Sequence, residues 1–291
     1  MNLHLLRIFA TVVEQQSFSR AAEALEVSQP AVSKAVRELE SQLEVVLLDR
    51  GGRQFQLSEP GKVLYEYARS IFSMERAATE AVQAFYALDR GKLTIGASTT
   101  IAAYWLPKYV AEFSRQYPAI QLQLMSGNTQ HVAQWLLDCA VDVALVEGPV
   151  RDERLEVRPW QEEEMVIIAA KSSPLGRRPK LDAAVLGEPM WIMRERGSGS
   201  REVVERALAE RDIGPHRQLE VGSNEGIVEM VAAGTGIGMV PLICVRDALA
   251  VGRVVALNLP EDRITRMLHR LRLPRRPVSA AALAFEALIA N

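Results

Sequence analysis

The chain of 291 residues is long enough for about two domains, and its 48% hydrophobic and 24% charged residues are typical of a globular protein. No apolar run reaches the ~18 residues of a membrane-spanning helix, and the first residues lack the features of a secretory signal, so we expect a cytoplasmic protein. The net charge is −2, and residues 1–60 hold six basic and eight acidic side chains, which excludes a general basic field for DNA. Recognition of nucleic acid would therefore depend on where the few cations lie.

Three short helices are predicted near the start of the chain. The first is indicated by apolar residues at helical spacing, which are Leu3, Leu6, Phe9, Ala10 and Val13. The second is expected over Arg20–Leu25, with Ser19 as its N-cap. The third is expected after the N-cap residue Ser28 and begins with Gln29-Pro30, because proline is tolerated in a first helical turn.

The third helix is predicted to have two distinct faces. Its buried stripe consists of Val32, Val36, Leu39 and Leu43, which step by four, three and four residues. A polar face carries Gln29, Ser33 and Arg37, with Lys34 beside them. A helix-turn-helix presents such N-terminal polar residues to the major groove, where Gln reads adenine and Arg reads guanine. The candidate DNA-contacting residues of this helix are Ser28, Gln29, Pro30, Ser33, Lys34 and Arg37.

A small hairpin is predicted directly after the third helix. Residues 45–50 and 55–57 have strand character, and the Gly-rich turn Gly51-Gly52-Arg53-Gln54 separates them. Arg53 at the tip is placed to reach a phosphate or the minor groove. The first 60 residues therefore predict a winged helix-turn-helix.

This segment resembles the LysR-type transcriptional regulators. The resemblance is carried by SFSRAAEALEVSQPAVSKAVRELESQL followed by LLDRGGRQFQLSEPG. The chain departs from that family at Glu44, Val46 and Leu48, where Gly, Pro and Phe are usual, and these positions affect the turn into the wing rather than the polar face. The alternative is a helical bundle with no DNA role. The polar face, the SQP start and the Arg-tipped hairpin occur together, which favours DNA binding.

A long linker helix is predicted from Pro60 to Leu88. Apolar residues recur every three or four positions, and they are Leu64, Tyr67, Ile71, Met74, Ala78, Ala81, Phe85 and Leu88. Such a heptad seam needs a partner helix, so these residues are predicted to form a homodimer. The alternative is that the helix packs against its own domain. The family resemblance implies a dimer on two-fold-related DNA half-sites, and a homotetramer built as a dimer of dimers.

The remaining chain alternates strands and helices, which predicts an α/β fold with a sheet covered by helices. Strands are expected at 92–96, 120–124, 141–146, 165–170, 190–193, 219–221 and 237–240, with helices at 101–117 and 129–137 among them. The resemblance implies two α/β lobes like those of periplasmic solute-binding proteins. The expected domains are 1–59 (winged helix-turn-helix), 60–89 (linker) and 90–291 (effector domain), with lobe I at about 91–162 and 268–291 and lobe II at about 163–267.

Small polar residues follow predicted strands or precede predicted helices at four places. Ligands of open α/β sheets bind at such junctions, where helix N-termini attract anions. The residues are Ser98, Thr99, Thr100, Asn128, Thr129, Ser198, Ser200 and Asn224. Each by itself is better explained as a plain helix cap, but the resemblance implies that these positions line one effector cleft. Glu147 ends a buried strand nearby, and it would repel an anion unless it is protonated or paired, for which Arg196 is the candidate.

We therefore predict a DNA-binding regulator whose promoter binding is modulated by a small anion or carboxylate. We expect no cofactor and no metal site, and RNA polymerase is a further candidate partner. An enzyme is disfavoured because the four histidines are scattered and no G-x-S-x-G or H-E-x-x-H motif occurs. The run Gly234–Gly238 follows a helix and precedes a strand, which is the reverse of a dinucleotide-binding loop. Cys139 and Cys244 lie in apolar surroundings and are interpreted as inert thiols.

Overall fold

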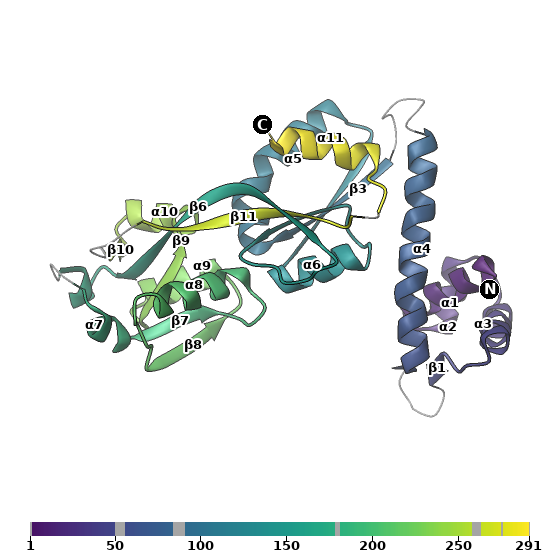
Figure 1. Ribbon diagram of the computed structural model, residues 1–291, viewed down its shortest axis with the longest axis horizontal. Helices are drawn as coiled ribbons and strands as arrows, with labels where there is room; N and C mark the ends of the chain where they lie inside the picture. The colour runs from purple at the N-terminus through teal and green to yellow at the C-terminus, as the bar shows by residue number, and fades with distance from the viewer. Residues whose placement is uncertain are drawn as a thin grey trace. The chain divides into compact units, whose positions relative to one another are not determined.

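The computed structural model describes residues 2–49, 56–83, 91–177, 181–257, 263–274 and 276–290. The chain divides into unit 1 (residues 1–85 with 138–140) and unit 2 (residues 86–137 and 141–291). Figure 1 shows a helical unit 1 and an α/β unit 2. Among the described residues, no helix is both long and apolar enough to span a membrane.

Unit 1 begins with the three predicted helices, α1 (Leu3–Gln15), α2 (Phe18–Ala24) and α3 (Gln29–Leu43). Ser28 caps α3 as predicted, because its hydroxyl accepts from the Ala31 amide at 3.4 Å. The cap of α2 is Ser17 rather than Ser19, which corrects the prediction. Ser17 has an extended backbone and its hydroxyl accepts from the Arg20 amide, whereas Ser19 lies inside the helix.

A two-stranded wing follows α3. Strand β1 (Leu48–Asp49) pairs with β2 (Gln56–Leu57) in antiparallel register. Glu44 ends α3 with a left-handed backbone, φ +55°, a conformation that glycine adopts at lower cost. The carboxylate of Glu40 accepts from the amides of Leu47 (2.9 Å) and Leu48 (3.3 Å), which fixes the start of the wing. The predicted tip residue Arg53 lies outside the described residues.

Helix α4 (Glu59–Gln83) carries most of the predicted apolar residues, but part of the predicted dimer seam packs inside unit 1. Leu64 and Ile71 pack against the core of unit 1, so these two side chains stabilise their own unit, as the alternative to a free seam anticipated. Tyr67 and Met74 are instead 65% and 51% exposed, and Ala78 is also exposed. The exposed stripe of α4 is completed by Val63 and Val82. The predicted positions Ala81, Phe85 and Leu88 lie outside the described side chains.

In the described part of unit 2, nine strands form one mixed sheet in the order β4-β3-β5-β11-β6-β9-β7-β8, with β10 paired to β6. The strands are β3 (Gly91–Ser98), β4 (Ile120–Gly127), β5 (Val143–Glu147), β6 (Glu156–Ala170), β7 (Met190–Arg194), β8 (Arg217–Val221), β9 (Ile237–Pro241), β10 (Val254–Ala256) and β11 (Ile264–Arg272). The helices are η2 (Ile101–Trp105), α5 (Leu106–Gln116), α6 (Thr129–Leu137), η3 (Pro174–Arg177), α7 (Ala183–Gly187), α8 (Gly199–Ala209), α9 (Asn224–Ala232), α10 (Leu242–Ala250) and α11 (Ala280–Ala290).

The sheet is shared between two lobes with separate cores. In lobe I, one apolar cluster lies under α5 and α11 and a second lies under α6. In lobe II, one cluster lies under α7 and α8 and a second under α9 and α10. The long strands β6 and β11 pair along most of their length and run through both lobes (Figure 1). The two lobes are therefore joined by a pair of hydrogen-bonded strands.

The helix predicted at 101–117 is present, but its first turn η2 is a π-helix. Pro107 explains this turn, because proline has no N–H for the regular i→i−4 bond and crowds the preceding turn. The widened turn follows Thr100, so it lies directly beside the polar residues described next.

Candidate functional site

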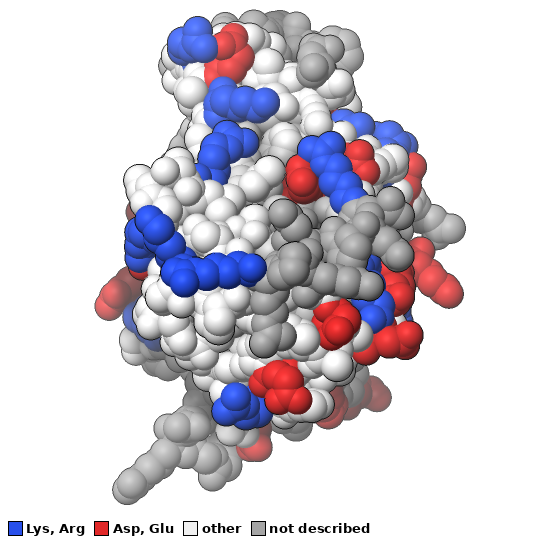
Figure 2. Space-filling model, turned by 90° about the vertical axis from the view of Figure 1, so that its left-hand side faces the viewer, with Lys and Arg blue, Asp and Glu red and all other residues white. Residues whose placement is uncertain are grey.

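The polar face of α3 is exposed as the sequence indicates. Gln29, Pro30, Lys34 and Arg37 are exposed, and Ser33 is half-buried. Val32, Val36 and Leu39 are buried on the other side, so the core fixes which face the helix presents. Within the described part of the chain, Lys34 and Arg37 form no ion pair, which leaves both cations available to DNA. Figure 2 shows the lobe II end of unit 2, where basic and acidic side chains are mixed, in keeping with the net charge of −2.

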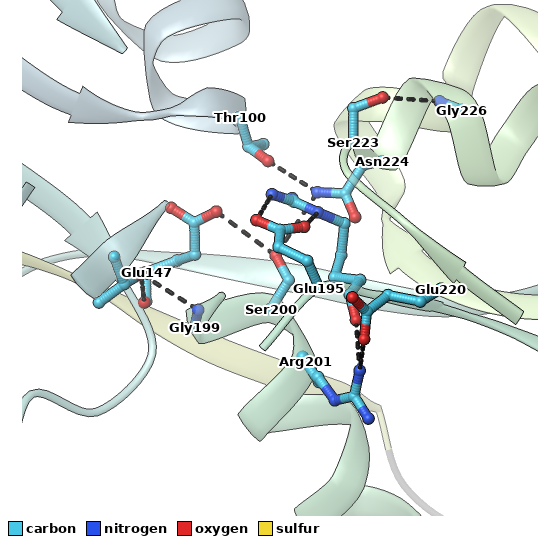
Figure 3. A network of polar contacts seen from close by, with 12 residues as sticks. Thr100, Glu147, Glu195, Gly199, Ser200, Arg201, Glu220, Ser223, Asn224 and Gly226 are labelled. Atoms are coloured by element: carbon cyan, nitrogen blue, oxygen red, sulfur yellow. Dashed lines mark hydrogen bonds and ion pairs between the residues drawn. The ribbon is translucent and has the colours of Figure 1, made fainter. Parts of the chain in front are cut away.

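A buried polar cluster lies where strand ends meet helix starts in unit 2. Thr100 precedes η2, Glu147 ends β5, Ser200 lies in the first turn of α8, and Asn224 begins α9 (Figure 3). All four are almost fully buried. Asn224 Nδ2 donates to Thr100 Oγ1 at 2.8 Å, and Ser200 Oγ donates to Glu147 Oε1 at 3.4 Å. Both contacts join the two lobes, so these junctions lie together in the structure.

A second inter-lobe contact lies at Thr129, the first residue of α6. Its hydroxyl donates to the backbone oxygen of Glu147 at 2.8 Å and accepts from the amide of Gly199 at 3.2 Å. Glycine is needed here, because a Cβ on Gly199 would lie 1.7 Å from the Glu147 carbonyl oxygen. Gly148 has φ +80°, and a Cβ on it would lie 2.7 Å from the Cα of Gly199. The two lobes therefore touch backbone to backbone at this point.

Two buried arginines belong to the cluster, and sequence reasoning missed both. Arg266 on β11 donates through Nε to Glu163 Oε2 (2.7 Å) and through Nη1 to Ser200 Oγ (2.6 Å). Its Nη1 also lies 3.9 Å from Glu147 Oε1. Glu163 on β6 in turn accepts from the indole N–H of Trp105 at 2.7 Å. Arg266 thus connects β11, one of the two strands that join the lobes, to Glu163 on β6 and to Ser200 on α8.

Arg194 ends β7, and its guanidinium is buried against the carboxylate of Glu195. Arg196 was predicted to pair with Glu147, and this prediction is wrong because Arg196 is exposed. The positive charges that act on Glu147 are those of Arg266 and Arg194. A cation directly after an apolar strand was the available signal for Arg194, whereas nothing had predicted a strand around Arg266.

Several buried polar atoms of the cluster have no hydrogen-bond partner among the described residues. These atoms are Ser98 Oγ, Thr99 Oγ1, Glu147 Oε2, Arg194 Nη1, Asn224 Oδ1 and Arg266 Nη2. For Arg266 Nη2 the 2.6 Å approach to Glu163 is an ion pair whose angle does not meet hydrogen-bond geometry. Buried polar groups are costly when unpaired, so a gathering of them indicates a place where a ligand or water binds.

Burial raises the pKa of Glu147 above its usual range, although the charges of Arg266 and Arg194 act to lower it. The nearby carboxylate of Glu163 raises this pKa further. Glu147 therefore tends to hold a proton where an exposed glutamate would be ionised. This protonation lowers the repulsion that an anion would meet in the cluster.

Two other predicted residues lie at helix starts. Asn128 caps α6, because its Oδ1 accepts from the His131 amide at 3.0 Å. Ser198 is buried at the start of α8 but makes no side-chain capping bond.

Cys139 and Cys244 form no disulfide bond, and burial raises the pKa of the Cys244 thiol. Among the described residues, no group of three or more His, Cys, Asp or Glu could hold a metal ion.

A groove of about 830 Å³ adjoins the cluster. It is lined by Thr129, Gln130, Ala133, Gln134 and Leu137 of lobe I, by the segment 149–152, and by Gly197, Glu202, Glu205 and Arg206 of lobe II. Thr129 lines this groove and also makes the contact to Gly199. The Thr129–Gly199 contact therefore lies at the boundary between the groove and the lobe interface.

Comparison with known proteins gives two family matches. Residues 3–62 match the family described as "Bacterial regulatory helix-turn-helix protein, lysR family", and residues 87–291 match the "LysR substrate binding domain". The HTH-type transcriptional regulator YeiE of Escherichia coli (strain K12) is 35% identical over 98% of this chain and 96% of its own.

Solved structures share the fold. A full-length OxyR variant from Pseudomonas aeruginosa gives a TM-score of 0.78 at 24% identity, covering 99% of this chain and 93% of its own. The regulatory domain of CcmR from Synechocystis PCC6803, solved in complex with 2-PG, gives 0.63 at 25% identity, covering 69% of this chain and 96% of its own.

Proposed function

Because this chain belongs to the LysR family of DNA-binding transcriptional regulators, we propose that a small oxyanion or carboxylate binds its buried cluster and modulates promoter binding. The observation that carries this proposal is the pair of buried guanidinium groups, of which Arg194 has a nitrogen, Nη1, with no partner among the described residues. Guanidinium N–H groups are preferred donors to carboxylate and phosphate oxygens. The complex of the CcmR domain with 2-PG, an organic phosphate, supports the same ligand class.

The charge balance of the cluster favours an anion only when Glu147 is protonated. Arg194 pairs with Glu195 and Arg266 pairs with Glu163, so these four charges cancel. Protonated Glu147 leaves a neutral cluster with free donors from Ser98, Thr99 and Arg194. We propose Ser98, Thr99, Thr100, Thr129, Ser200 and Asn224 as the other effector-site residues, with Asn128 and Ser198 shaping the helix starts. The adjoining groove is the route by which we expect the effector to approach.

The proposed DNA contacts are the exposed face of α3, with Gln29, Ser33 and Arg37 toward base edges and Lys34 toward a phosphate. Ser28 and Pro30 set the start of this helix, and Arg53 completes the surface from the wing. The domain boundaries that we propose are 1–59, 60–89 and 90–291, and we expect the protein to act in the cytoplasm, where the promoter DNA is.

The proposed dimer uses the exposed stripe of α4, defined by Val63, Tyr67, Met74, Ala78 and Val82. An exposed apolar stripe at helical spacing on a 25-residue helix is typical of an interhelical interface. Pairing two winged helices raises the effective concentration of the second on DNA, which compensates for the weak basic charge of each. A dimer of dimers and a contact with RNA polymerase are further parts of this proposal.

Isothermal titration calorimetry of the full chain tests the ligand class. The panel consists of inorganic sulfate, inorganic phosphate, 2-phosphoglycolate and glycolate, with glycerol and an alkylamine as neutral and cationic controls. We expect at least one anion to bind, and an Arg266→Met variant to lose that binding. Binding of only the neutral or cationic compounds would reject an anion site.

A gel shift on the upstream region of the gene itself or of its neighbour tests the DNA surface. Arg37→Ala and Gln29→Ala are each expected to weaken specific binding by about 1–3 kcal/mol, since each removes a paired contact to one base. Glu38→Ala is the matched control on an exposed position of the same helix. Unchanged affinity of both variants would reject this face.

A further inference from the structure

The guanidinium of Arg194 is held on one edge and free on the other. Its Nε and Nη2 donate to the two carboxylate oxygens of Glu195 at 2.8 and 3.0 Å. Nη1 is buried and has no partner among the described residues. A two-point contact to a carboxylate fixes the plane of a guanidinium as well as its position. Glu195 therefore determines where the free Nη1 edge points.

Arg201 holds the backbone at the same place. Its Nη1 donates to the carbonyl oxygen of Arg194 at 2.8 Å and to Glu220 at 2.8 Å. The main chain of Arg194 is thus fixed from α8 and β8. Figure 3 shows the contact between Arg201 and Glu220. The orientation of its side chain depends on Glu195.

Glu195 also reaches the other lobe. Although burial acts to raise it, the pKa of Glu195 lies below its usual range, because of the bonds from Arg194 and a weaker contact with Asn128, which precedes α6 in lobe I. Asn128 Oδ1 accepts from the His131 amide, and its Nδ2 would lie 3.4 Å from a Cβ placed on Gly197, so the amide group faces the segment 195–197. The amide of Gln130 donates to the Gly197 carbonyl at 3.1 Å beside this contact. The segment 195–197 of lobe II therefore lies against the start of α6.

We propose that Glu195 is a positioning residue that orients Arg194 toward the anion and, through Asn128, couples this orientation to contact between the lobes. The inference rests on the proposed anion site. It predicts a change in anion affinity opposite in direction to the change that the charge of Glu195 alone would give. Removing a carboxylate near an anion site should strengthen anion binding, because it removes Coulomb repulsion. Losing the orientation of Arg194 should instead weaken anion binding. The two roles of Glu195 thus predict opposite changes in affinity.

Calorimetry with 2-phosphoglycolate and inorganic sulfate on the full chain distinguishes the two signs. Glu195→Gln leaves one oxygen acceptor for Arg194 and is expected to weaken binding of the probe at least tenfold. Glu195→Asp restores the two-point acceptor on a shorter side chain and should recover part of this loss. Glu229→Gln removes a carboxylate of the same lobe that pairs with Arg253 on the surface, and it should change the affinity less than twofold.

Equal or tighter binding by Glu195→Gln than by the wild type would overturn the orienting role. If the wild type binds neither probe, the proposed anion site fails for these anions, and the orienting role fails with it. A wild type that binds while Glu195→Gln is unaffected leaves the anion site intact and rejects only this inference.

Thermal unfolding without any ligand tests the link between the lobes. Asn128→Ser keeps an N-cap oxygen for α6 but removes the amide group that lies beside Glu195. We expect Asn128→Ser and Glu195→Gln each to lower the melting temperature, and the double variant to melt no lower than Glu195→Gln alone. Additive losses would mean that the two side chains act independently, and they would overturn the link.

Discussion

The sharpest test of the lobe interface is Gly199→Ala. The added Cβ would lie 1.7 Å from the Glu147 carbonyl oxygen and 2.6 Å from Thr129 Oγ1, where ordinary contact begins at 3.4 Å. Gly199 and the end of β5 must therefore separate by about 1.7 Å, the difference between 3.4 and 1.7 Å. The bond from the Gly199 amide to Thr129 Oγ1 is already 3.2 Å, so a shift of this size breaks it.

The expected cost follows from two effects. Overpacking of this kind destabilises by about 1–3 kcal/mol, and loss of a buried hydrogen bond adds about 1 kcal/mol. For a unit of roughly 200 residues, a total of about 2–4 kcal/mol lowers the melting temperature by roughly 4–16 °C. The shift also moves the adjacent Ser200 away from Arg266, so affinity for the anion that binds the wild type should fall at least about tenfold, or 1.4 kcal/mol.

Differential scanning calorimetry and anion titration of the full chain measure both effects. Gly222→Ala is the matched control, because a Cβ at Gly222 meets nothing within 4 Å and its backbone is not left-handed. A Gly199→Ala protein that melts within 1 °C of the Gly222→Ala protein, and binds the anion equally well, would refute the close approach of the lobes.

Three further predictions concern other parts of the chain. Because burial raises the pKa of Glu147, its stabilising contribution is complete below the ordinary glutamate pKa and is lost as pH rises through the folded-state pKa, by up to about 1.4 kcal/mol per pH unit. Glu147→Gln should remove this slope from urea unfolding between pH 4.5 and 9, and equal slopes in both proteins would contradict the assignment. Glu40→Ala should destabilise unit 1 by about 1.5–3 kcal/mol, because two wing amides lose a charged acceptor, and it should weaken DNA binding in a gel shift. Tyr67→Glu combined with Met74→Glu should reduce the mass in light scattering to that of a smaller assembly, whereas Leu283→Glu on the exposed face of α11 should leave it unchanged; an unaltered mass in the double variant would exclude the α4 stripe.

Local signals made unit 1 predictable from its sequence. The spacing of Val32, Val36 and Leu39 defines the buried side of α3, and the opposite face is then exposed by geometry alone. The family resemblance also marked Glu44 as a departure from glycine, and its left-handed backbone gives the physical reason. Such features depend on neighbours within one or two helical turns, which a sequence displays directly.

The seam of α4 was only partly predictable, because periodicity does not say which partner an apolar face meets. Leu64 and Ile71 share the core of unit 1 with Phe72, while Tyr67 and Met74 lie on an exposed side of the same helix. Heptad spacing includes both the buried and the exposed residues, since a broad apolar surface on one helix can contact two different partners. Only the packing of α4 against α1–α3 separates the two uses.

The charged part of the buried polar cluster was missed for a related reason. Glu163 and Arg266 lie on β6 and β11, where they are 103 positions apart in sequence and bonded across the sheet. Each looks like an ordinary surface charge in a segment rich in Glu or Arg. Their burial is decided by strand pairing between distant segments, and neither periodicity nor capping reports it.

The position of these charges gives the effector a physical means to influence the lobes. A ligand shifts a conformational equilibrium only by the difference in its binding free energy between the two states. The unpaired atoms come from both lobes, with Ser98 in lobe I and Arg194 in lobe II, while Arg266 lies on a strand that belongs to both. An anion that bonds to all three therefore binds differently when the lobes shift. Hydrogen bonds to charged groups contribute about 1.5–3 kcal/mol each, so two or three bonds made in only one arrangement supply the ~5.5 kcal/mol that converts a 1:99 population into 99:1. Ligand contacts confined to a single lobe would contribute nothing to this difference in binding free energy. We therefore expect Arg266, on the strand shared by both lobes, to determine the response to the ligand more than any helix cap does.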